Sequence, residues 1–513
     1  MLDLGTSFLA CAERMPTARA IVEGDVSWTY AALRDKTLSV LAALRDVGIR
    51  HGDRVVTALQ NRRETVLVHW ACQLGGFVVT PVNWRVRPEE LDYALQNSEA
   101  VAVVYEEVTA ETVRSANLAG SVRQIAVGDA AADDGAHRLD EMLACAPAEA
   151  VSAAGPDDIS IMLYTSGTTG RGKGVPRRHR AERAAAVAHL AQNQYGRGEV
   201  TLGVMPLYHT MGVRSLISMC LINGLFICQP RFNVEETLRL IEAERITSLY
   251  LVPTLYHDLV HSPAFAQTEI GSVKKLGYAG ATMTDGLLLR LSELFKPSLF
   301  VNHYGSSEIY TFTIESDAPS KPGSAGKAGL NQRIRVVQLN GTGPDDLADA
   351  NEEGEIIATM RSDEAFEGYW RRPEADEKAI RDGWYFTGDI GYLDDDGDLF
   401  VTGRVDDMII SGGENILPAE IESVLSLHDA VGEVAVVGLA DERLGSRVAA
   451  FVQRISAVSE ADLDAWCKQS DLASFKRPRT YVFVKEIPKS PVGKLLRRKL
   501  TAGEYEAETE AKE

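Results

Sequence analysis

An alternation of strand and helix patterns is the feature that most constrains the fold of this chain. Residues 55–60 (VVTALQ) have a strand pattern, residues 62–75 (RRETVLVHWACQLG) a helical one, and residues 77–83 (FVVTPVN) a strand pattern again. Two consecutive strands joined by a helix lie parallel in one sheet. The sequence therefore predicts a βαβ unit and, with it, a parallel sheet.

The same alternation returns further along the chain. Pro88 opens a helical pattern that runs through Leu95 and precedes VAVVY, and the helical segment VEETLRLIEAERI precedes SLYLVP. Parallel sheets are covered by helices on both faces. The 513 residues are 45% apolar, and single cores stop growing near about 250 to 300 residues. We expect an α/β protein whose large N-terminal body holds helix-covered, largely parallel sheets.

The pattern changes near residue 400. Residues 391–409 place acids and glycines between short strand patterns, and a helix (419–427), two strands (433–439 and 447–453), another helix and a last strand (480–484) follow. These short elements predict a small, mobile α+β domain at the C-terminal end. We place the large domain at residues 1–403 and the small one at residues 404–513.

Composition excludes several classes of function. The formal net charge of −20 leaves no general basic surface for a phosphate backbone, so we expect no nucleic-acid partner. The six cysteines show no C-x-x-C spacing, which suits a reduced compartment. The most apolar run, residues 216–228, is shorter than the about 20 residues that span a bilayer, and the N-terminus lacks a signal-peptide pattern. We expect a cytoplasmic protein without a membrane partner, and a homodimer stays open.

The stretch YTSGTTGRGKGVP, residues 164–176, permits more than one interpretation. Residues 167–173 read G-x-x-x-x-G-K, close to the Walker phosphate loop, but a Walker lysine precedes Ser or Thr and a helix. Here Gly-Val-Pro follows Lys173, and proline disfavours helix at the residue before it. The alternatives are an exposed Ser/Gly turn, or a loop after the strand at 159–164 whose hydroxyls and backbone N–H groups hold a triphosphate. We favour the last.

The motif YTSGTTGRGKG resembles the signature loop of the adenylate-forming superfamily, which holds acyl-CoA ligases, carrier-protein adenylation domains and firefly-type luciferases. Companion motifs stand in the order of that family: MPLYHTMG, YAGATM, HYGSSE, GWYFTGD, GRVDDMIISGGENI and SPVGKLLRR. Their wording is similar to the branch that holds 4-chlorobenzoate:CoA ligase. Three positions depart from the pattern: Gly172 for a proline, Ser306-Ser307 for a threonine pair, and Leu444 for an aromatic of the pantetheine tunnel.

The resemblance implies an ATP-dependent acid:CoA ligase. Such an enzyme joins a carboxylate to the α-phosphorus of ATP, giving acyl-AMP and pyrophosphate, and then transfers the acyl group to CoA. Magnesium would be held by Glu308. The catalytic set implied by the motifs is Lys494, Glu308, His209, Asp406 and Lys173. The nucleotide set is Thr165, Ser166, Gly167, Thr168, Thr169, Gly170, Gly280, Ala281, Thr282, Tyr304, Ser307, Asp389 and Arg404.

The two half-reactions need different groups, so the resemblance implies domain alternation about a hinge at Asp406. The small domain would exchange Lys494 for the SGGENI loop, where Gly412 and Gly413 let pantetheine pass close to the backbone. An ordinary turn is the other interpretation of this glycine pair. The residues matched to the nucleotide end of CoA are Arg85, Phe475, Arg477 and Arg479, for which solvated side chains are the alternative.

The resemblance also implies an acyl pocket, lined by His209, Thr210, Met211, Tyr250, Ala279, His303, Gly305, Tyr310 and Thr311. The side chains of His303 and Tyr310 add hydrogen-bonding capacity to a small, partly aromatic pocket. We expect a benzoate-like acid, as in aromatic acid degradation, while short-chain and cyclic aliphatic acids stay open.

Four other functions fit parts of the pattern. A standalone adenylation enzyme would load a carrier protein with the same motifs, and a luciferase-like oxygenase would share the adenylation step. A phosphate-loop NTPase would release ADP and orthophosphate. A catalytically silent nucleotide-binding module is the non-enzymatic reading, which the presence of Lys173, Glu308, Asp389 and Lys494 disfavours.

Overall fold

The computed structural model describes residues 2–130, 136–165, 172–339, 341, 343–489 and 495–508. Contacts within the chain divide it into two units. Unit 1 comprises Met1–Arg333 and Thr359–Gly383, and unit 2 comprises Ile334–Ala358 and Trp384–Glu513. The predicted domain boundary between residues 403 and 404 stays a prediction.

The first sheet of unit 1 contains the predicted βαβ unit. Helix α3 (Arg63–Gly75) connects strands β3 and β4, which pair in parallel, so this prediction is confirmed. Every neighbouring pair in the sheet is parallel except β8 and β9. The strand order is β7 (His137–Arg138), β6 (Arg123–Ala126), β5 (Ala100–Tyr105), β3 (Arg54–Ala58), β4 (Val78–Pro81), β8 (Ile159–Thr165) and β9 (Lys173–Arg178).

The second sheet of unit 1 has a parallel centre and antiparallel ends. The strands from β14 to β1 in its order pair in parallel, whereas β2, β15 and β16 pair in the opposite sense. The order is β16 (Ser324–Ala328), β15 (Thr313–Glu315), β14 (Leu299–Tyr304), β13 (Lys275–Ala279), β12 (Ser248–Leu251), β10 (Val200–Gly203), β11 (Leu225–Cys228), β1 (Arg19–Glu23) and β2 (Val26–Thr29).

Helices between the two sheets join them into one body. Helix α7 (His179–Gln192) contacts β8 and β9, α8 (Thr210–Ile222) contacts β10 and β11, and the two helices contact each other. One apolar core takes side chains from both sheets and from these helices, together with α1 (Leu4–Arg14) and α2 (Tyr30–Asp46). The run at residues 216–228, expected to be buried core, forms the end of α8 and strand β11.

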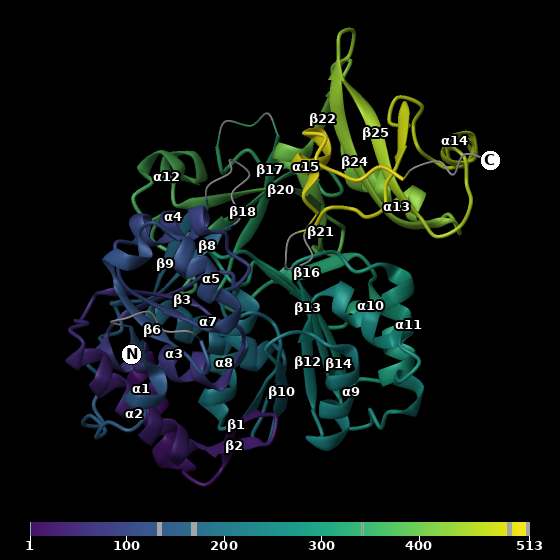
Figure 1. The fold of residues 1–513 in the computed structure, drawn as a ribbon. Helices are drawn as coiled ribbons and strands as arrows, with labels where there is room; N and C mark the ends of the chain where they lie inside the picture. Colours follow the sequence, from purple (N-terminus) through teal and green to yellow (C-terminus); the bar gives the residue numbers. More distant parts are fainter. Residues whose placement is uncertain are drawn as a thin grey trace. The chain divides into compact units, whose positions relative to one another are not determined.

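Further helices cover the outer faces. Helices α9 (Val234–Ala243), α10 (Pro253–His261) and α11 (Asp285–Phe295) gather beside β12 to β14 in Figure 1 and share a core with them. Helices α4 (Pro88–Ser98) and α5 (Glu107–Ser115) share another core with β3 and β5. The helix-covered, largely parallel α/β body predicted from the alternation is thus confirmed.

Unit 2 contains one sheet of four strands, one hairpin and one small α+β region. The four-stranded sheet has the order β17 (Ile334–Gln338), β18 (Gly354–Thr359), β20 (Trp384–Leu393) and β21 (Leu399–Arg404). The small region pairs β24 (Val431–Asp441), β25 (Gly445–Arg454) and β26 (Thr480–Phe483), with helices α13 (Pro418–Ser426), α14 (Glu460–Gln469) and α15 (Arg497–Thr501). Its three strands and the helices α13 and α14 match those expected from the sequence, whereas α15 was not expected.

Across the part of the chain that the structure describes, no helix combines the length and apolar character needed to cross a membrane.

Candidate active site

The strands on both sides of the glycine-rich loop decide between its interpretations. Strand β8 ends at Thr165, and β9 begins at Lys173 and runs back antiparallel, with these two residues paired. The chain continues as a strand and enters helix α7 only at His179. A Walker loop would run into a helix directly after its lysine, so that interpretation is excluded. Ser166, Gly167, Thr168, Thr169 and Gly170 lie outside the described residues, and their phosphate-binding role stays a prediction.

Neighbouring segments fix the β9 end of this loop. The Tyr93 hydroxyl donates to the carbonyl of Gly172 at 2.9 Å, and the backbone N–H of Trp370 donates to the carbonyl of Gly174 at 2.8 Å. The hydroxyl of Thr165 is buried and has no hydrogen-bond partner among the described residues. Buried hydroxyls are normally satisfied, so Thr165 has hydrogen-bonding capacity to spare at the point where the loop begins.

Glu308 and Lys173, two predicted catalytic residues, meet at a tyrosine that the sequence did not reveal. Glu308 follows strand β14, is 5% exposed, and accepts a hydrogen bond from the Tyr369 hydroxyl at 2.6 Å. The ammonium of Lys173 lies 3.9 Å from the centre of the Tyr369 ring, within cation–π range. Tyr369 precedes Trp370 in a stretch without helical or strand periodicity, which gave no signal for its role.

A buried ion pair supports the backbone at Glu308. The Nη1 of Arg177 donates to the carbonyls of Ser307 and Glu308, at 3.3 and 3.0 Å. Arg177 is fully buried, forms an ion pair with Glu182, and stacks on the ring of Tyr310 at 3.7 Å. Burial lowers the pKa of Arg177, but the Glu182 carboxylate raises it, and the net shift is upward. Arg177 stays charged and holds the turn of the HYGSSE motif in place.

The residues expected at the adenine follow two neighbouring strands of the second sheet. Ala279 of β13 pairs with His303 of β14, so residues 280–282 and Tyr304 continue from adjacent strand ends. Residues 280–282 are exposed, and Gly280 has φ +85°, a conformation that favours glycine. The structure therefore brings Gly280, Ala281, Thr282, Tyr304, Gly305, Ser307 and Glu308 to one edge of the sheet.

The loop of the MPLYH motif is held by Asn61, which the sequence analysis did not identify. The Asn61 amide donates to the carbonyls of Gly203 and Met205, at 2.9 and 2.6 Å, and accepts from the N–H of Leu207 at 3.0 Å. The loop leads to His209, which caps α8 by accepting from the N–H of Met211 at 3.3 Å. His209, Thr210 and Met211 therefore form the N-terminal end of this helix.

Residues assigned to the acyl pocket surround a buried arginine. Arg214 of α8 donates to the Thr311 hydroxyl at 2.7 Å, to the carbonyl of Tyr310 at 3.3 Å, and to the Tyr250 hydroxyl. The Tyr250 and His303 rings lie 5.3 Å apart in an edge arrangement. Arg214 was missed, although it is the one acidic or basic residue, histidine apart, in the apolar stretch 204–228.

Two side chains of this pocket have polar atoms in contact with other residues. The Tyr310 hydroxyl donates to Glu182 at 3.0 Å, so it does not supply the free hydrogen-bonding capacity expected of it. Nε2 of His303 lies 3.0 Å from the amide nitrogen of Asn193. Burial and then the charge of Arg214 hold the pKa of His303 well below its usual value, so this imidazole is neutral at neutral pH.

Asp389 and Arg404, the predicted nucleotide residues of unit 2, face each other. They pair in register across β20 and β21, and their side chains form an ion pair. The N–H of Asp389 also donates to the Thr387 hydroxyl at 3.0 Å. A carboxylate held in this way can accept hydrogen bonds from two neighbouring hydroxyls, as the predicted ribose role requires.

The glycine pair of unit 2 forms the turn of a hairpin. Gly412 and Gly413 connect β22 (Ile409–Ser411) to β23 (Glu414–Ile416), with φ +63° and +90°. The N–H of Gly412 donates to the carbonyl of Leu444 at 2.8 Å, and space beside Gly413 is open. A two-residue turn with both φ positive requires glycine by itself. The turn and the pantetheine interpretations are compatible.

The remaining predicted residues are dispersed. Asp406 is exposed in a short 3-10 helix, Val405–Asp407. Arg85 is exposed and stacks on Trp84 in unit 1, and Phe475 is 42% exposed in unit 2. The stretch with Phe475 also contains Arg477, which is partly buried, and Arg479, which is exposed. Lys494 lies outside the described residues.

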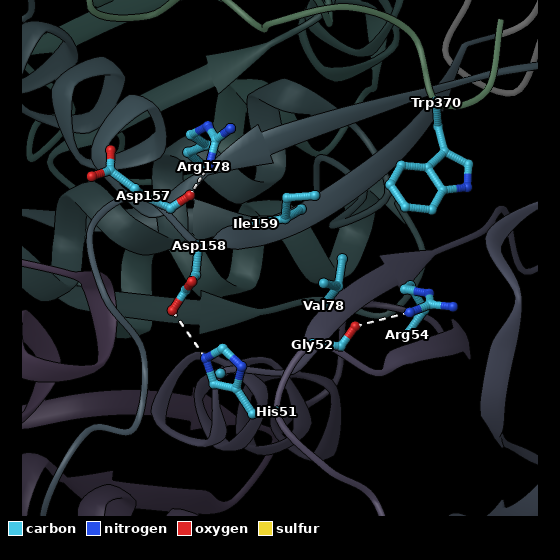
Figure 2. A pocket seen from close by; sticks show the side chains of 10 residues that line it. His51, Gly52, Arg54, Val78, Asp157, Asp158, Ile159, Arg178 and Trp370 are labelled. Carbon is cyan, nitrogen blue, oxygen red and sulfur yellow. Dashed lines mark hydrogen bonds and ion pairs between the residues drawn. The ribbon is translucent and has the colours of Figure 1, made fainter.

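One pocket of about 240 Å³ lies beside Trp370, at the other edge of the first sheet (Figure 2). Arg54, Val78 and Ile159, at the starts of β3, β4 and β8, line it, so it lies at the opposite edge of the sheet from Thr165. His51 closes it on one side through a contact of 3.0 Å to Asp158. The pocket is separate from the edge where the motifs gather.

Two protein-family models match the chain. The model of the AMP-binding enzyme matches residues 8–370, and that of the AMP-binding enzyme C-terminal domain matches residues 420–494. Among curated proteins, the 4-chlorobenzoate–CoA ligase of an Arthrobacter species is 31% identical over 95% of this chain and 93% of its own length. The long-chain fatty acid–CoA ligase FadD13 of Mycobacterium tuberculosis is 33% identical over 97% of each.

Solved structures of other proteins are similar in fold to this chain along nearly its whole length. ATP-bound MatB from Rhodopseudomonas palustris is 27% identical, with a TM-score of 0.88 over 98% of this chain and 99% of that one. The o-succinylbenzoate coenzyme A synthetase MenE from Bacillus subtilis, in complex with ATP and magnesium, is 28% identical, with a TM-score of 0.84 over 96% and 98%.

Proposed function

The chain belongs to the AMP-binding enzyme family, and we propose that it is an AMP-forming ligase that joins a carboxylic acid to coenzyme A. ATP and the acid would give acyl-AMP and pyrophosphate, and the CoA thiol would then take the acyl group and release AMP. The named relatives are acyl- and aryl-CoA ligases, which supports this level of assignment.

The contact of Tyr369 with both Lys173 and Glu308 carries the proposal. It brings the cation of the glycine-rich loop and the carboxylate of the HYGSSE motif to one side chain at the same edge of the fold. Adenylation needs cations and oriented donors where a carboxylate and a triphosphate meet, since both reactants are anions. Residues from three separate parts of the sequence supply such a place.

The Glu308 carboxylate suits magnesium. It is buried and takes a hydrogen bond from Tyr369, but no ion pair involves it among the described residues. A buried carboxylate without a cation is costly, and magnesium prefers carboxylate, phosphate and water oxygens. Bound magnesium would neutralise part of the triphosphate charge. The chain's own contribution is to fix that carboxylate through Tyr369 and through the Arg177 contacts to its backbone.

The other predicted residues take complementary roles. Thr165 and Lys173 would hold the terminal phosphates, Asp389 would accept from the ribose hydroxyls, and Lys494 would bridge carboxylate and α-phosphate during adenylation. A turn of the small domain about Asp406 would then bring Gly413 to the thiol path. These roles come from the family resemblance and remain proposals.

We propose a benzoate-like or other cyclic acid as the substrate. Tyr250 and His303 meet edge to face beside Ala279, which suits a ring better than a long alkyl chain. The relatives act on acids as different as 4-chlorobenzoate and long-chain fatty acids. The identity of the acid therefore depends on this pocket rather than on family membership.

A product assay over a panel of acids tests the function. With ATP, magnesium and CoA, we expect AMP and pyrophosphate only when a carboxylic acid is present, together with an acyl-CoA. ADP as the main nucleotide product would refute the proposal. Transfer of the acyl group to a carrier protein but not to CoA would identify the carrier protein as the acceptor and favour a standalone adenylation enzyme.

A further inference from the structure

Arg214 is a buried cation whose direct contacts are all to uncharged oxygens. Its side chain is 2% exposed and donates to the hydroxyls of Thr311 and Tyr250 and to the carbonyl of Tyr310. Among the described residues, no carboxylate lies within 4 Å of it. Buried charges are normally paired, because taking an ion out of water costs several kcal/mol.

The nearest acids do not replace such a partner. The charge of Arg214 acts on Glu364, but this carboxyl makes its hydrogen bond to Asn331, at 3.1 Å. Burial raises the pKa of Glu364 and the charge of Arg214 lowers it, with a net upward shift. Glu182 is paired with Arg177. Arg214 is therefore left with weaker, longer-range compensation.

Buried polar atoms without hydrogen-bond partners gather at the same place. Nε of Arg214, Nδ1 of His303 and Nε2 of His189 are buried and have no partner among the described residues. The His189 ring lies 5.2 Å from His303 and 4.9 Å from Tyr250. Nδ1 of His189 and Nε2 of His303 lie 2.9 and 3.0 Å from the same amide nitrogen, that of Asn193. Nε of Arg214, which always carries a hydrogen, therefore has a hydrogen bond to donate.

The cluster lies away from the reacting end of the acid. Helix α8 follows β10, so its first residue, next to the cap His209, is at the carboxyl edge of the sheet. Arg214 lies five residues beyond His209, a rise of about 7.5 Å along the helix. An acid whose carboxylate lies at the catalytic edge would direct its far end toward Arg214.

We propose that the acid carries a second carboxylate at its far end and that Arg214 binds this group, which determines substrate class. The inference rests on the proposed function. A guanidinium offers planar donors that match a carboxylate, and Nε of Arg214 remains without a partner among the described residues. The uncharged rings of His189 and His303 adjoin each other and Tyr250. A cyclic or aromatic dicarboxylic acid satisfies both the charge and the ring contacts.

Matched acid pairs test the proposal through pyrophosphate release and acyl-CoA formation. Terephthalate is compared with 4-methylbenzoate, 1,4-cyclohexanedicarboxylate with cyclohexanecarboxylate, and adipate with hexanoate. On at least one ring scaffold, we expect the diacid to exceed its partner at least tenfold in kcat/KM, chiefly through KM. Equal or better use of the monoacid on every scaffold would overturn the proposal. So would equal use of 4-acetylbenzoate and terephthalate, because a neutral acceptor would then suffice.

Variants separate binding from folding. Arg214→Gln should bring the diacid-to-monoacid ratio of kcat/KM close to one, whereas Arg214→Lys should keep part of the preference. Tyr250→Phe, which leaves the cation, should retain it. Arg239→Gln on the exposed face of α9 is the matched surface control. If Arg214→Gln does not fold, Arg214→Lys is compared with wild type instead. The assignment would be overturned if the diacid-to-monoacid ratio of kcat/KM were unchanged in Arg214→Lys and lost in Tyr250→Phe. If no acid releases pyrophosphate at all, the proposed function itself fails.

Discussion

Arg177 and Arg214 are two buried arginines of the same unit, and they differ in what neutralises them. Each lies over a tyrosine ring, Arg177 at 3.7 Å from Tyr310 and Arg214 at 5.4 Å from Tyr250. Arg177 has a carboxylate in direct contact, that of Glu182, whereas the contacts of Arg214 are to uncharged oxygens. A carboxylate of the protein itself neutralises the charge of Arg177, whereas no carboxylate of the described residues is in direct contact with Arg214.

From this difference we infer that Arg177 supports the reacting end of the site and that Arg214 selects the acid. Arg177 also donates to the backbone of Glu308, so its ion pair fixes the reacting end of the site for any acid. Arg214 contacts the residues expected around the acyl group, so it bears on which acid fits. Loss of the first should damage folding and catalysis with every substrate. Loss of the second should change the order of substrates.

The largest effect is expected from Arg177→Met. This change leaves the Glu182 carboxylate buried without its partner, which typically costs about 3 to 5 kcal/mol. We expect the free energy of unfolding, measured by urea denaturation, to fall by about this amount. The double variant Arg177→Met with Glu182→Gln should recover part of the loss. A change below about 1 kcal/mol would show that the ion pair is not the support that the comparison assigns to it.

Glu308→Gln should have the next largest effect, and on catalysis rather than folding. Loss of one preorganised charged group in a site of this kind costs about a hundredfold in rate. We expect single-turnover formation of acyl-AMP to slow by that factor with diacids and monoacids alike. Glu367→Gln, at an exposed ion pair with Arg178, is the matched control and should change the rate little. An effect confined to one class of acid would contradict the assignment of Glu308 to the reacting end.

Low pH should destabilise the region around Arg214, which contains His189 and His303, more than the region around Arg177. Burial first, and then the charge of Arg214, holds the pKa of His189 and His303 well below 6.5. These rings are protonated in the unfolded chain and neutral in the fold as the pH falls below 6.5, so stability is present above that pH and is lost below it. Each should cost about 2 kcal/mol by pH 5. Urea denaturation across pH 7 to 5 measures the slope.

The histidine variants identify where this slope arises. His303→Gln should make the fall in unfolding free energy between pH 7 and 5 less steep, whereas the same change at the exposed His257 should not. Burial also lowers the pKa of His69 to about 3 and that of His179 to about 4, so part of the slope will persist in every variant. An unchanged slope in His303→Gln would mean that this ring takes up its proton in the folded state.

The sequence predicted the sheets better than it predicted this polar cluster. Strand–helix–strand alternation is a local pattern, so β3, α3 and β4 could be recognised from consecutive residues. The contacts of Arg214 cannot be read in that way, because Thr311 lies 97 positions away. Its one local sign was a charge within an apolar helical stretch, which requires a partner wherever the helix is buried.

At the catalytic edge, too, contacts between distant segments could not be read from the sequence. Motifs identified Lys173 and Glu308 separately, but Tyr369, which contacts both, lies 61 positions beyond Glu308 and carries no periodic pattern. Asn61 likewise fixes a loop 142 to 146 positions away. In both cases the role depends on segments that only the folded sheets bring together. Sequence patterns identify the reacting groups more readily than the residues that position them.

Tyr369→Phe should have the smallest effect and gives the finest test of the comparison. The change removes the hydroxyl that donates to Glu308 at 2.6 Å but keeps the ring beneath Lys173, so one hydrogen bond to a charged group is lost and the cation–π contact stays. Such a bond contributes about 1.5 kcal/mol, or roughly tenfold in rate. We expect single-turnover acyl-AMP formation to slow by this factor, and the diacid-to-monoacid ratio to stay at its wild-type value. Tyr93→Phe, which removes a hydroxyl bound to the uncharged carbonyl of Gly172, is the matched control and should cost less. A shift in the ratio with Tyr369→Phe would mean that the reacting end also selects the acid, and the separation between support at Arg177 and selection at Arg214 would no longer hold.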